Sequence, residues 1–195
     1  MEKGDYFDEL LRSPRTVFSF KEIALLWNDS GTKAARVRVD YYIKTGKLIR
    51  LRQGLYAKDK EYNHLELATK IFTPSYITFE TVLLQAGITF QYYGKEFFLA
   101  SYLTREVKID GMTYTFKKIK DSVLTSSLGI KHENFYSIAT PERAFLDTIY
   151  RSKSYHFDNM GALNWDMVFT ILPIYQNDAM KTTVTEYHDH YKSTL

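Results

Sequence analysis

The sequence predicts an α+β fold in which an N-terminal winged helix-turn-helix, residues 1–60, is followed by a larger mixed α/β C-terminal domain, residues 61–195. Helical apolar spacing recurs three times before a short strand pair, and mixed helix and strand patterns follow. The charge distribution separates the same two parts. Residues 31–58 contain eight basic residues and one acid, a net charge of +7, whereas the rest of the chain sums to −4. This concentration indicates a local anion-binding surface in the N-terminal domain.

Two helices are expected near the N-terminus. Apolar residues at helical spacing over residues 6–11 predict a short first helix. Ser19 is followed three residues later by Glu22, a capping-box pattern that predicts a second helix over residues 20–28. The turn-forming residues 28–31 then separate this helix from the next one.

A third helix and a strand pair complete the N-terminal domain. Thr32 is expected to cap this helix and Gly46 to end it. Its buried face should consist of Ala35, Val39, Tyr42 and Ile43. Residues 48–52 and 55–57 are expected to form two strands around Gln53-Gly54, where glycine supplies the positive φ of a tight hairpin. Two helices joined by a turn and followed by a hairpin are the order of a winged helix-turn-helix.

The outward face of the third helix is expected to enter the major groove of double-stranded DNA, which is wide enough to admit a helix. The residues expected to contact bases are Lys33, Arg36, Val37 and Tyr41. The residues expected mainly to hold phosphates are Arg38, Lys44, Lys47, Arg50 and Arg52. Thr32 at the start of the helix and Gln53 at the hairpin turn complete the predicted DNA-binding set.

The C-terminal domain begins with two predicted helices. One covers residues 65–71, and a second is expected to be capped by Thr78 and closed by Gly87. Strands are expected over residues 97–102, 106–109, 112–118 and 135–139. Between two of them, Asp110-Gly111 is a strong two-residue hairpin signal.

The end of the chain is predicted to be helical. Thr140-Pro141-Glu142 places a cap, a proline at the first helical position and an acid at the positive end of the helix dipole. The last 30 residues also have helical patterns. The sequence does not predict a role for residues 152–195.

Three stretches in this order resemble the AbiEi-like antitoxins of type IV toxin–antitoxin systems, a family first known from abortive infection of phage. They are GKLIRLRQGLYA at residues 46–57, PSYITFETVLLQAGI at residues 74–88 and IATPERAFLD at residues 138–147. The family often has a small, hydroxyl-rich segment after the residue that corresponds to Tyr76, where this chain has Phe79-Glu80. The resemblance spans the first 150 residues and does not extend beyond Arg151.

The resemblance implies a transcriptional autorepressor that binds inverted repeats upstream of its operon through the winged helix. It further implies that the C-terminal domain counteracts a cognate nucleotidyltransferase-like toxin. Inverted repeats require two copies on the DNA, and the free protein is expected to be a monomer or a weak dimer. No cofactor is implied.

The sequence does not predict a catalytic or metal site. Glu142, Arg143 and Asp147 could form a polar catalytic cluster, but an arginine and an aspartate four residues apart are more often a salt bridge on a helix. His188 and His190 point about 200° apart on a helix, and Glu186 with His190 lacks a third ligand. The absence of cysteine excludes disulfides, thiolate zinc sites and a cysteine nucleophile.

A cytoplasmic protein without a membrane partner is expected. The N-terminus lacks the basic and apolar regions of a signal peptide, and every apolar run is shorter than the roughly 20 residues that cross a bilayer. Three alternatives stay open. The basic N-terminal face could dock an acidic protein, the same fold could bind RNA, or the chain could be an enzyme without a recognisable motif.

Overall fold

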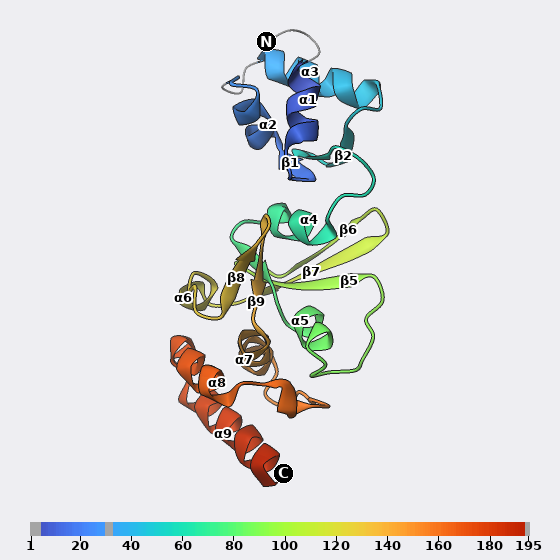
Figure 1. The fold of residues 1–195 in the computed structure, drawn as a ribbon. Helices are drawn as coiled ribbons and strands as arrows, with labels where there is room; N and C mark the ends of the chain where they lie inside the picture. The colour runs from blue at the N-terminus through green and yellow to red at the C-terminus, as the bar shows by residue number, and fades with distance from the viewer. Residues whose placement is uncertain (1–4, 30–32, 194–195) are drawn as a thin grey trace. The chain divides into compact units, whose positions relative to one another are not determined.

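The protein has a mixed α+β structure that divides into two compact units, Met1–Ile71 and Phe72–Leu195 (Figure 1). The structure is a computed structural model that describes residues 5–29 and 33–193. None of the helices in these two ranges has the length and apolarity that crossing a bilayer requires.

Over residues 5–29 and 33–71, the first unit combines four helices with a three-stranded sheet. Its elements are α1 (Asp5–Arg12), β1 (Val17–Ser19), α2 (Phe20–Leu26), α3 (Lys33–Lys44), β2 (Ile49–Arg52), β3 (Leu55–Ala57) and α4 (His64–Ile71). The three helices predicted before residue 46 are therefore confirmed. The capping box of α2 is also confirmed, because the Ser19 hydroxyl accepts from the Glu22 backbone N–H and the Glu22 carboxylate accepts from the Ser19 backbone N–H, at 3.2 and 2.7 Å.

The sheet of the first unit has the order β1-β3-β2, and both pairings are antiparallel. The predicted β2–β3 hairpin is present, with Gly54 at φ +82° in its turn. The short strand β1 was not predicted. It pairs with β3 and leads into α2, whose first residue, Phe20, donates its backbone N–H to the Gly54 carbonyl at 3.1 Å. The hairpin turn is thereby tied to the start of α2.

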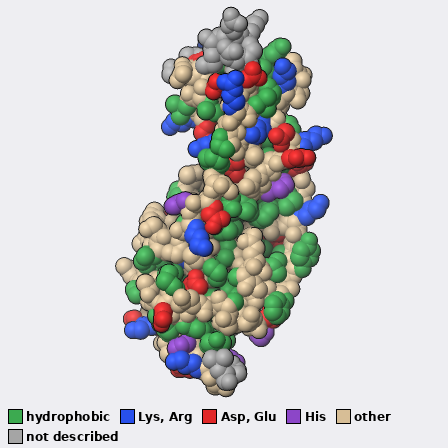
Figure 2. Space-filling model, viewed as in Figure 1, with side chains coloured by type: hydrophobic (Ala, Val, Ile, Leu, Met, Phe, Trp, Pro, Cys, Tyr) green, Lys and Arg blue, Asp and Glu red, His purple; other side chains and the backbone are tan. Residues whose placement is uncertain are grey.

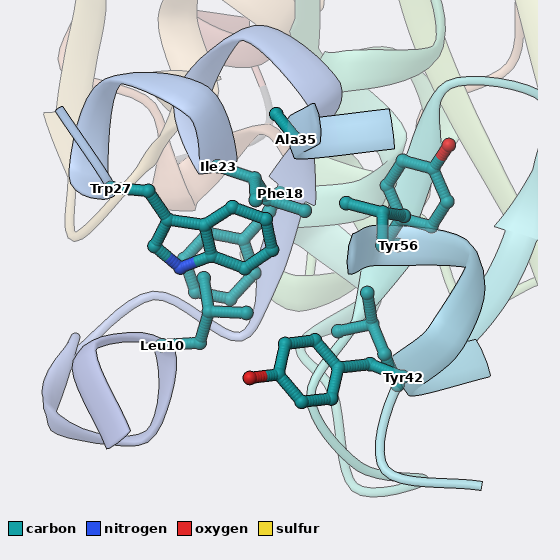
Figure 3. Close-up of a cluster of buried hydrophobic side chains, with 9 residues drawn as sticks. Leu10, Phe18, Ile23, Trp27, Ala35, Tyr42 and Tyr56 are labelled. Carbon is teal, nitrogen blue, oxygen red and sulfur yellow. The ribbon is translucent and has the colours of Figure 1, made fainter. Parts of the chain in front are cut away.

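A cluster of apolar side chains from α1, α2, α3 and the sheet fills the centre of the first unit (Figure 3). Its buried members are Leu10, Phe18, Ile23, Trp27, Ala35, Val39, Tyr42, Leu48 and Tyr56. The predicted buried face of α3 is confirmed for three of its four residues, and the fourth, Ile43, is half-buried. Packing of this face orients α3, so its opposite side is turned to solvent.

Helix α4 belongs to the first unit, whereas the sequence places the start of the second domain at residue 61. The physical reason is a set of contacts with the start of β1 and with α2. The buried carboxylate of Glu66 accepts the backbone N–H groups of Thr16 and Val17 at 2.9 and 3.2 Å. Lys70 also donates to the Glu22 carboxylate at 2.5 Å.

The second unit is built on a six-stranded mixed sheet with the order β6-β7-β5-β4-β9-β8. Its strands are β4 (Ser75–Ile77), β5 (Glu96–Ser101), β6 (Arg105–Ile109), β7 (Met112–Lys118), β8 (Ile130–Glu133) and β9 (Tyr136–Ala139). The pairs β5–β7 and β4–β9 are parallel, and the other neighbours are antiparallel. The Asp110-Gly111 hairpin is confirmed, since both residues have positive φ, 51° and 75°.

Helices cover one face of this sheet (Figure 1). They are α5 (Glu80–Gln85), α6 (Asp121–Leu124), α7 (Pro141–Arg151), α8 (Trp165–Ile171) and α9 (Asp178–Ser193), with 3-10 helices η1 (Met160–Ala162) and η2 (Leu172–Tyr175). Helices α5 and α7 pack against each other and against strands, and α8 and α9 pack on α7. The predicted cap of α7 is confirmed, because the Thr140 hydroxyl accepts from the Arg143 backbone N–H.

The predicted cap of α5 is wrong. Thr78 precedes the helix by two positions, and the residue at its N-terminal boundary is Phe79, which has φ 54° and makes no side-chain capping bond. The Thr78 hydroxyl donates instead to the buried carboxylate of Asp147 at 2.9 Å. Thr78 therefore uses its hydroxyl in a long-range hydrogen bond and does not cap α5.

Candidate functional site

The outward side of α3 carries most of the residues predicted to contact bases. Lys33 and Arg36 are exposed, and so are two large apolar side chains, Val37 at 70% and Tyr41 at 58%. Lys44 is exposed at the end of the same helix. Thr32 lies outside the described residues. The helix thus presents an apolar strip flanked by cations, on the side opposite its buried residues.

A cavity of about 350 Å³ separates α3 from the β2–β3 hairpin. It is lined by Phe20, Arg36, Val39, Asp40, Arg50, Gln53, Gly54 and Tyr56. The guanidinium carbon of Arg36 lies 5.4 Å from the centre of the Phe20 ring, a cation–π contact. Arg36 therefore lines the cavity while its side chain stays exposed to solvent.

Arg50 on β2 is paired with Asp40 on α3. Arg50 Nη2 lies 2.7 Å from Asp40 Oδ1, and about half of each side chain is exposed. The pair therefore links the helix to the hairpin across the cavity. It also couples one of the predicted phosphate-binding residues to the single acid of residues 31–58.

Arg38 is directed toward the core of the first unit. Its guanidinium carbon lies 3.7 Å from the centre of the Tyr6 ring and 5.3 Å from that of Trp27. One of its nitrogens lies 3.4 Å from the Asp29 carboxylate. Because rings and an acid surround this charge, Arg38 connects α1, α2 and α3, and it does not lie with the exposed cations of α3.

The other predicted residues lie at or near the hairpin. Lys47 is exposed, with its ammonium nitrogen 5.7 Å from the centre of the Phe7 ring. Arg52 is half-buried on β2, and Gln53 is exposed at the turn. Among the described residues, the exposed cations of the predicted set that have no carboxylate within ion-pair distance are Lys33, Arg36, Lys44 and Lys47. On the face drawn in Figure 2, basic and acidic side chains are interspersed, in keeping with a net charge of only +3.

Sequence reasoning overlooked several contributors to this site. Phe20, Tyr56 and Gly54 line the cavity, and Asp40 holds Arg50. The first two are apolar residues that the sequence assigns to the core. The charge of Asp40 is visible as the one acid in a basic segment, but its partner ten residues away is not.

The alternative cluster in the second unit is a buried network. Arg143 and Asp147 form the salt bridge that the sequence predicts, with Arg143 Nε 3.2 Å from Asp147 Oδ1. Both side chains are 0% exposed. The Asp147 carboxylate accepts from Tyr76, Thr78 and Tyr175 at 2.9, 2.9 and 2.6 Å. Burial raises the pKa of the Tyr76 and Tyr175 phenols well above their usual value. The network joins β4, α7 and η2, and the absence of exposed surface favours a structural role.

The histidine-containing region of α9 brings few ligands together. His188 packs on the ring of Trp165, with centroids 4.8 Å apart. Glu186 and His190 line a separate cavity of about 300 Å³ with Lys153, Thr183 and Tyr187. Over residues 5–29 and 33–193, no three His, Asp or Glu side chains are close enough to hold a metal ion together.

No protein-family model matches the chain, and no curated protein matches it significantly.

Proposed function

We propose that this chain is a DNA-binding transcriptional autorepressor that reads its operator through a winged helix-turn-helix. The proposal rests above all on α3, which buries Ala35, Val39 and Tyr42 on one side and exposes cations and apolar groups on the other. In a winged helix-turn-helix the second helix of the motif enters the major groove, and the hairpin follows the backbone. Helix α3 and the β2–β3 hairpin have the corresponding order and exposure.

The exposed groups of α3 suit base edges. The Arg36 guanidinium can donate two hydrogen bonds to guanine, and Val37 and Tyr41 can contact the thymine methyl group. Lys44 and Lys47 are positioned as phosphate ligands, which fix the register without reading sequence. Two copies would occupy the half-sites of an inverted repeat, and the free protein would be a monomer or a weak dimer.

We extend the proposal to an antitoxin role for the second unit, on the resemblance of residues 46–57, 74–88 and 138–147 to the AbiEi-like family. The second unit would then counteract a nucleotidyltransferase-like toxin encoded nearby, and both proteins would act in the cytoplasm. Co-expression of the chain with such a toxin should restore growth. A variant that no longer binds DNA should still restore it, because the DNA surface lies in the first unit.

The DNA-binding part is tested by titrating the purified chain against duplex DNA from upstream of its own gene and against a scrambled duplex. The variant carries Arg36→Ala and Lys44→Ala, and the matched control is Arg12→Ala, an exposed arginine on α1. Preference for the upstream duplex should be lost in the double variant and kept in the control.

The second candidate function is a protein-interaction module whose basic face docks an acidic partner. The same exposed cations favour it, because a basic surface attracts any polyanion. Equal binding to both duplexes that salt abolishes, or no binding to either, would contradict the repressor and favour this alternative. Steep salt dependence combined with preference for one duplex would support the repressor.

A further inference from the structure

Asp40 occupies an unexpected position for an acid. It lies on α3 one turn after Arg36, between the exposed Val37 and Tyr41. Its side chain is 55% exposed, so packing does not explain its presence. A carboxylate on a surface that faces phosphates repels them and lowers affinity for every DNA sequence.

The pairing of Asp40 with Arg50 compounds this effect. At 2.7 Å the two groups form a charge-assisted hydrogen bond that holds the Arg50 guanidinium at the cavity between α3 and the hairpin. Half-exposed ion pairs contribute little to fold stability. The main consequence of Asp40 is therefore electrostatic, because its carboxylate adds one negative charge to the surface and engages the positive charge of Arg50.

The exposed lysines nearby differ from Arg50. Within residues 5–29 and 33–193, no carboxylate lies within ion-pair distance of Lys44 or Lys47. Their charges are available to phosphates. The pair thus acts on one cation of the hairpin and leaves those at the end of α3 available.

We infer that Asp40 limits the electrostatic affinity of this surface for DNA by withholding Arg50 from phosphates. The inference rests on the proposed DNA-binding function and deepens it. Non-specific affinity depends on the number of phosphates neutralised, whereas preference for one site depends on base contacts. Asp40 therefore lowers binding to all sequences and leaves discrimination to the base-contacting side chains of α3.

The test is a double-mutant cycle on salt dependence. Dissociation constants are measured by fluorescence anisotropy on upstream and scrambled duplexes between about 50 and 200 mM salt, the range over which phosphate contacts dominate affinity changes. The proteins are the full chain, Asp40→Asn, Arg50→Gln and the double variant. Lys44→Gln is the matched control, and thermal melts verify folding. Asp40→Ser replaces Asp40→Asn if the amide disturbs the fold.

The slope is that of the logarithm of the association constant against the logarithm of the salt concentration. Arg50→Gln alone should leave this slope unchanged. Asp40→Asn should steepen the slope by about 0.9, the value for one further phosphate contact, and should tighten binding to the scrambled duplex about as much as to the upstream one, or more. The double variant should return to the wild-type slope. Lys44→Gln should make the slope about 0.9 shallower with or without Asp40.

Two outcomes overturn the inference while leaving DNA binding intact. In the first, Arg50→Gln alone makes the slope as shallow as Lys44→Gln does, so Arg50 already holds a phosphate. In the second, Asp40→Asn weakens binding only to the upstream duplex at constant slope, so Asp40 accepts a hydrogen bond from a base. Failure of the wild-type chain to bind either duplex would instead refute the proposed function, and the inference with it.

Discussion

Replacing Arg143 with methionine tests the buried network of the second unit. Methionine keeps the apolar stem of the side chain and removes the guanidinium, which contacts the Asp147 carboxylate and the Tyr76 hydroxyl. The guanidinium also donates to the backbone carbonyls of Leu128 and Val123, at 2.6 and 2.7 Å. Arg143→Met therefore leaves a buried carboxylate without its cation and two carbonyl groups without their donors.

The expected loss of stability is large. Removing one partner of a buried ion pair costs about 3–5 kcal/mol, because the other charge stays buried without compensation. The orphaned Val123 carbonyl, whose hydrogen bond is buried, adds about 1–3 kcal/mol. The total is about 4–8 kcal/mol, compared with about 5–15 kcal/mol for the whole stability of an ordinary domain. Arg143→Met should leave the second unit largely unfolded, and Asp147→Leu in the same chain should recover part of the loss by removing the orphaned charge.

The assay uses the two tryptophans, of which Trp27 lies in the first unit and Trp165 in the second. In protein labelled with fluorotryptophan, each fluorine resonance follows the urea unfolding of its own unit. The matched control is Arg151→Met, an exposed arginine at the end of the same helix, which should change stability by less than about 0.5 kcal/mol. If Arg143→Met shifts the Trp165 transition no more than Arg151→Met does, the energetic role assigned to the network is refuted.

Three further outcomes are expected. Burial raises the pKa of Glu22, but the Lys70 hydrogen bond, the hydrogen bonds of Ser19 and the Lys70 charge together outweigh burial and lower this pKa below its ordinary 4.5. The resulting stability is present above pH 4.5 and lost as pH falls through the lowered pKa, so Glu22→Gln should flatten the acid limb of the Trp27 transition; an unchanged limb would contradict this. Thr140→Ala should cost about 1 kcal/mol in the Trp165 transition through loss of the α7 cap, and a cost near zero would show that the cap is dispensable. Arg38→Ala should cost about 1 kcal/mol in the Trp27 transition by removing the ring contacts and should leave the DNA salt slope unchanged; a shallower slope would place Arg38 on the phosphates.

Local signals predicted the elements whose causes are local. The capping box at Ser19, the Asp110-Gly111 hairpin and the Thr140 cap each depend on residues within a few positions of one another, and all three are present. The short strands β1, β4 and β8 were missed. Each has only three or four residues, too few to show alternation. The partners of β1 and β4 also lie far away in the sequence, whereas β8 forms a hairpin with the adjacent β9.

Helical periodicity predicts which residues make up the candidate site, but not which of their charges are paired with acids. The buried and exposed sides of α3 follow from helical periodicity, which is why Val37 and Tyr41 are exposed as expected. Tertiary contacts decide which cations are left without an acid partner and can bind phosphates. The partners of Arg38 and Arg50 lie nine and ten residues away, and no periodic rule connects those positions. The burial of Arg143 likewise depends on elements that only the folded second unit brings together.

The strand order of the second unit has a consequence for how the chain is made. Strand β4 is central, yet one of its two neighbours, β9, is encoded about sixty residues later. During synthesis from the N-terminus, the first unit has all its elements once Ile71 has emerged, while β4 keeps an open edge until residues 136–139 follow. An open edge is a template for pairing with other chains. Nascent or truncated chains that end between β4 and β9 should therefore be the aggregation-prone species, and ribosome pausing in that interval would prolong their exposure.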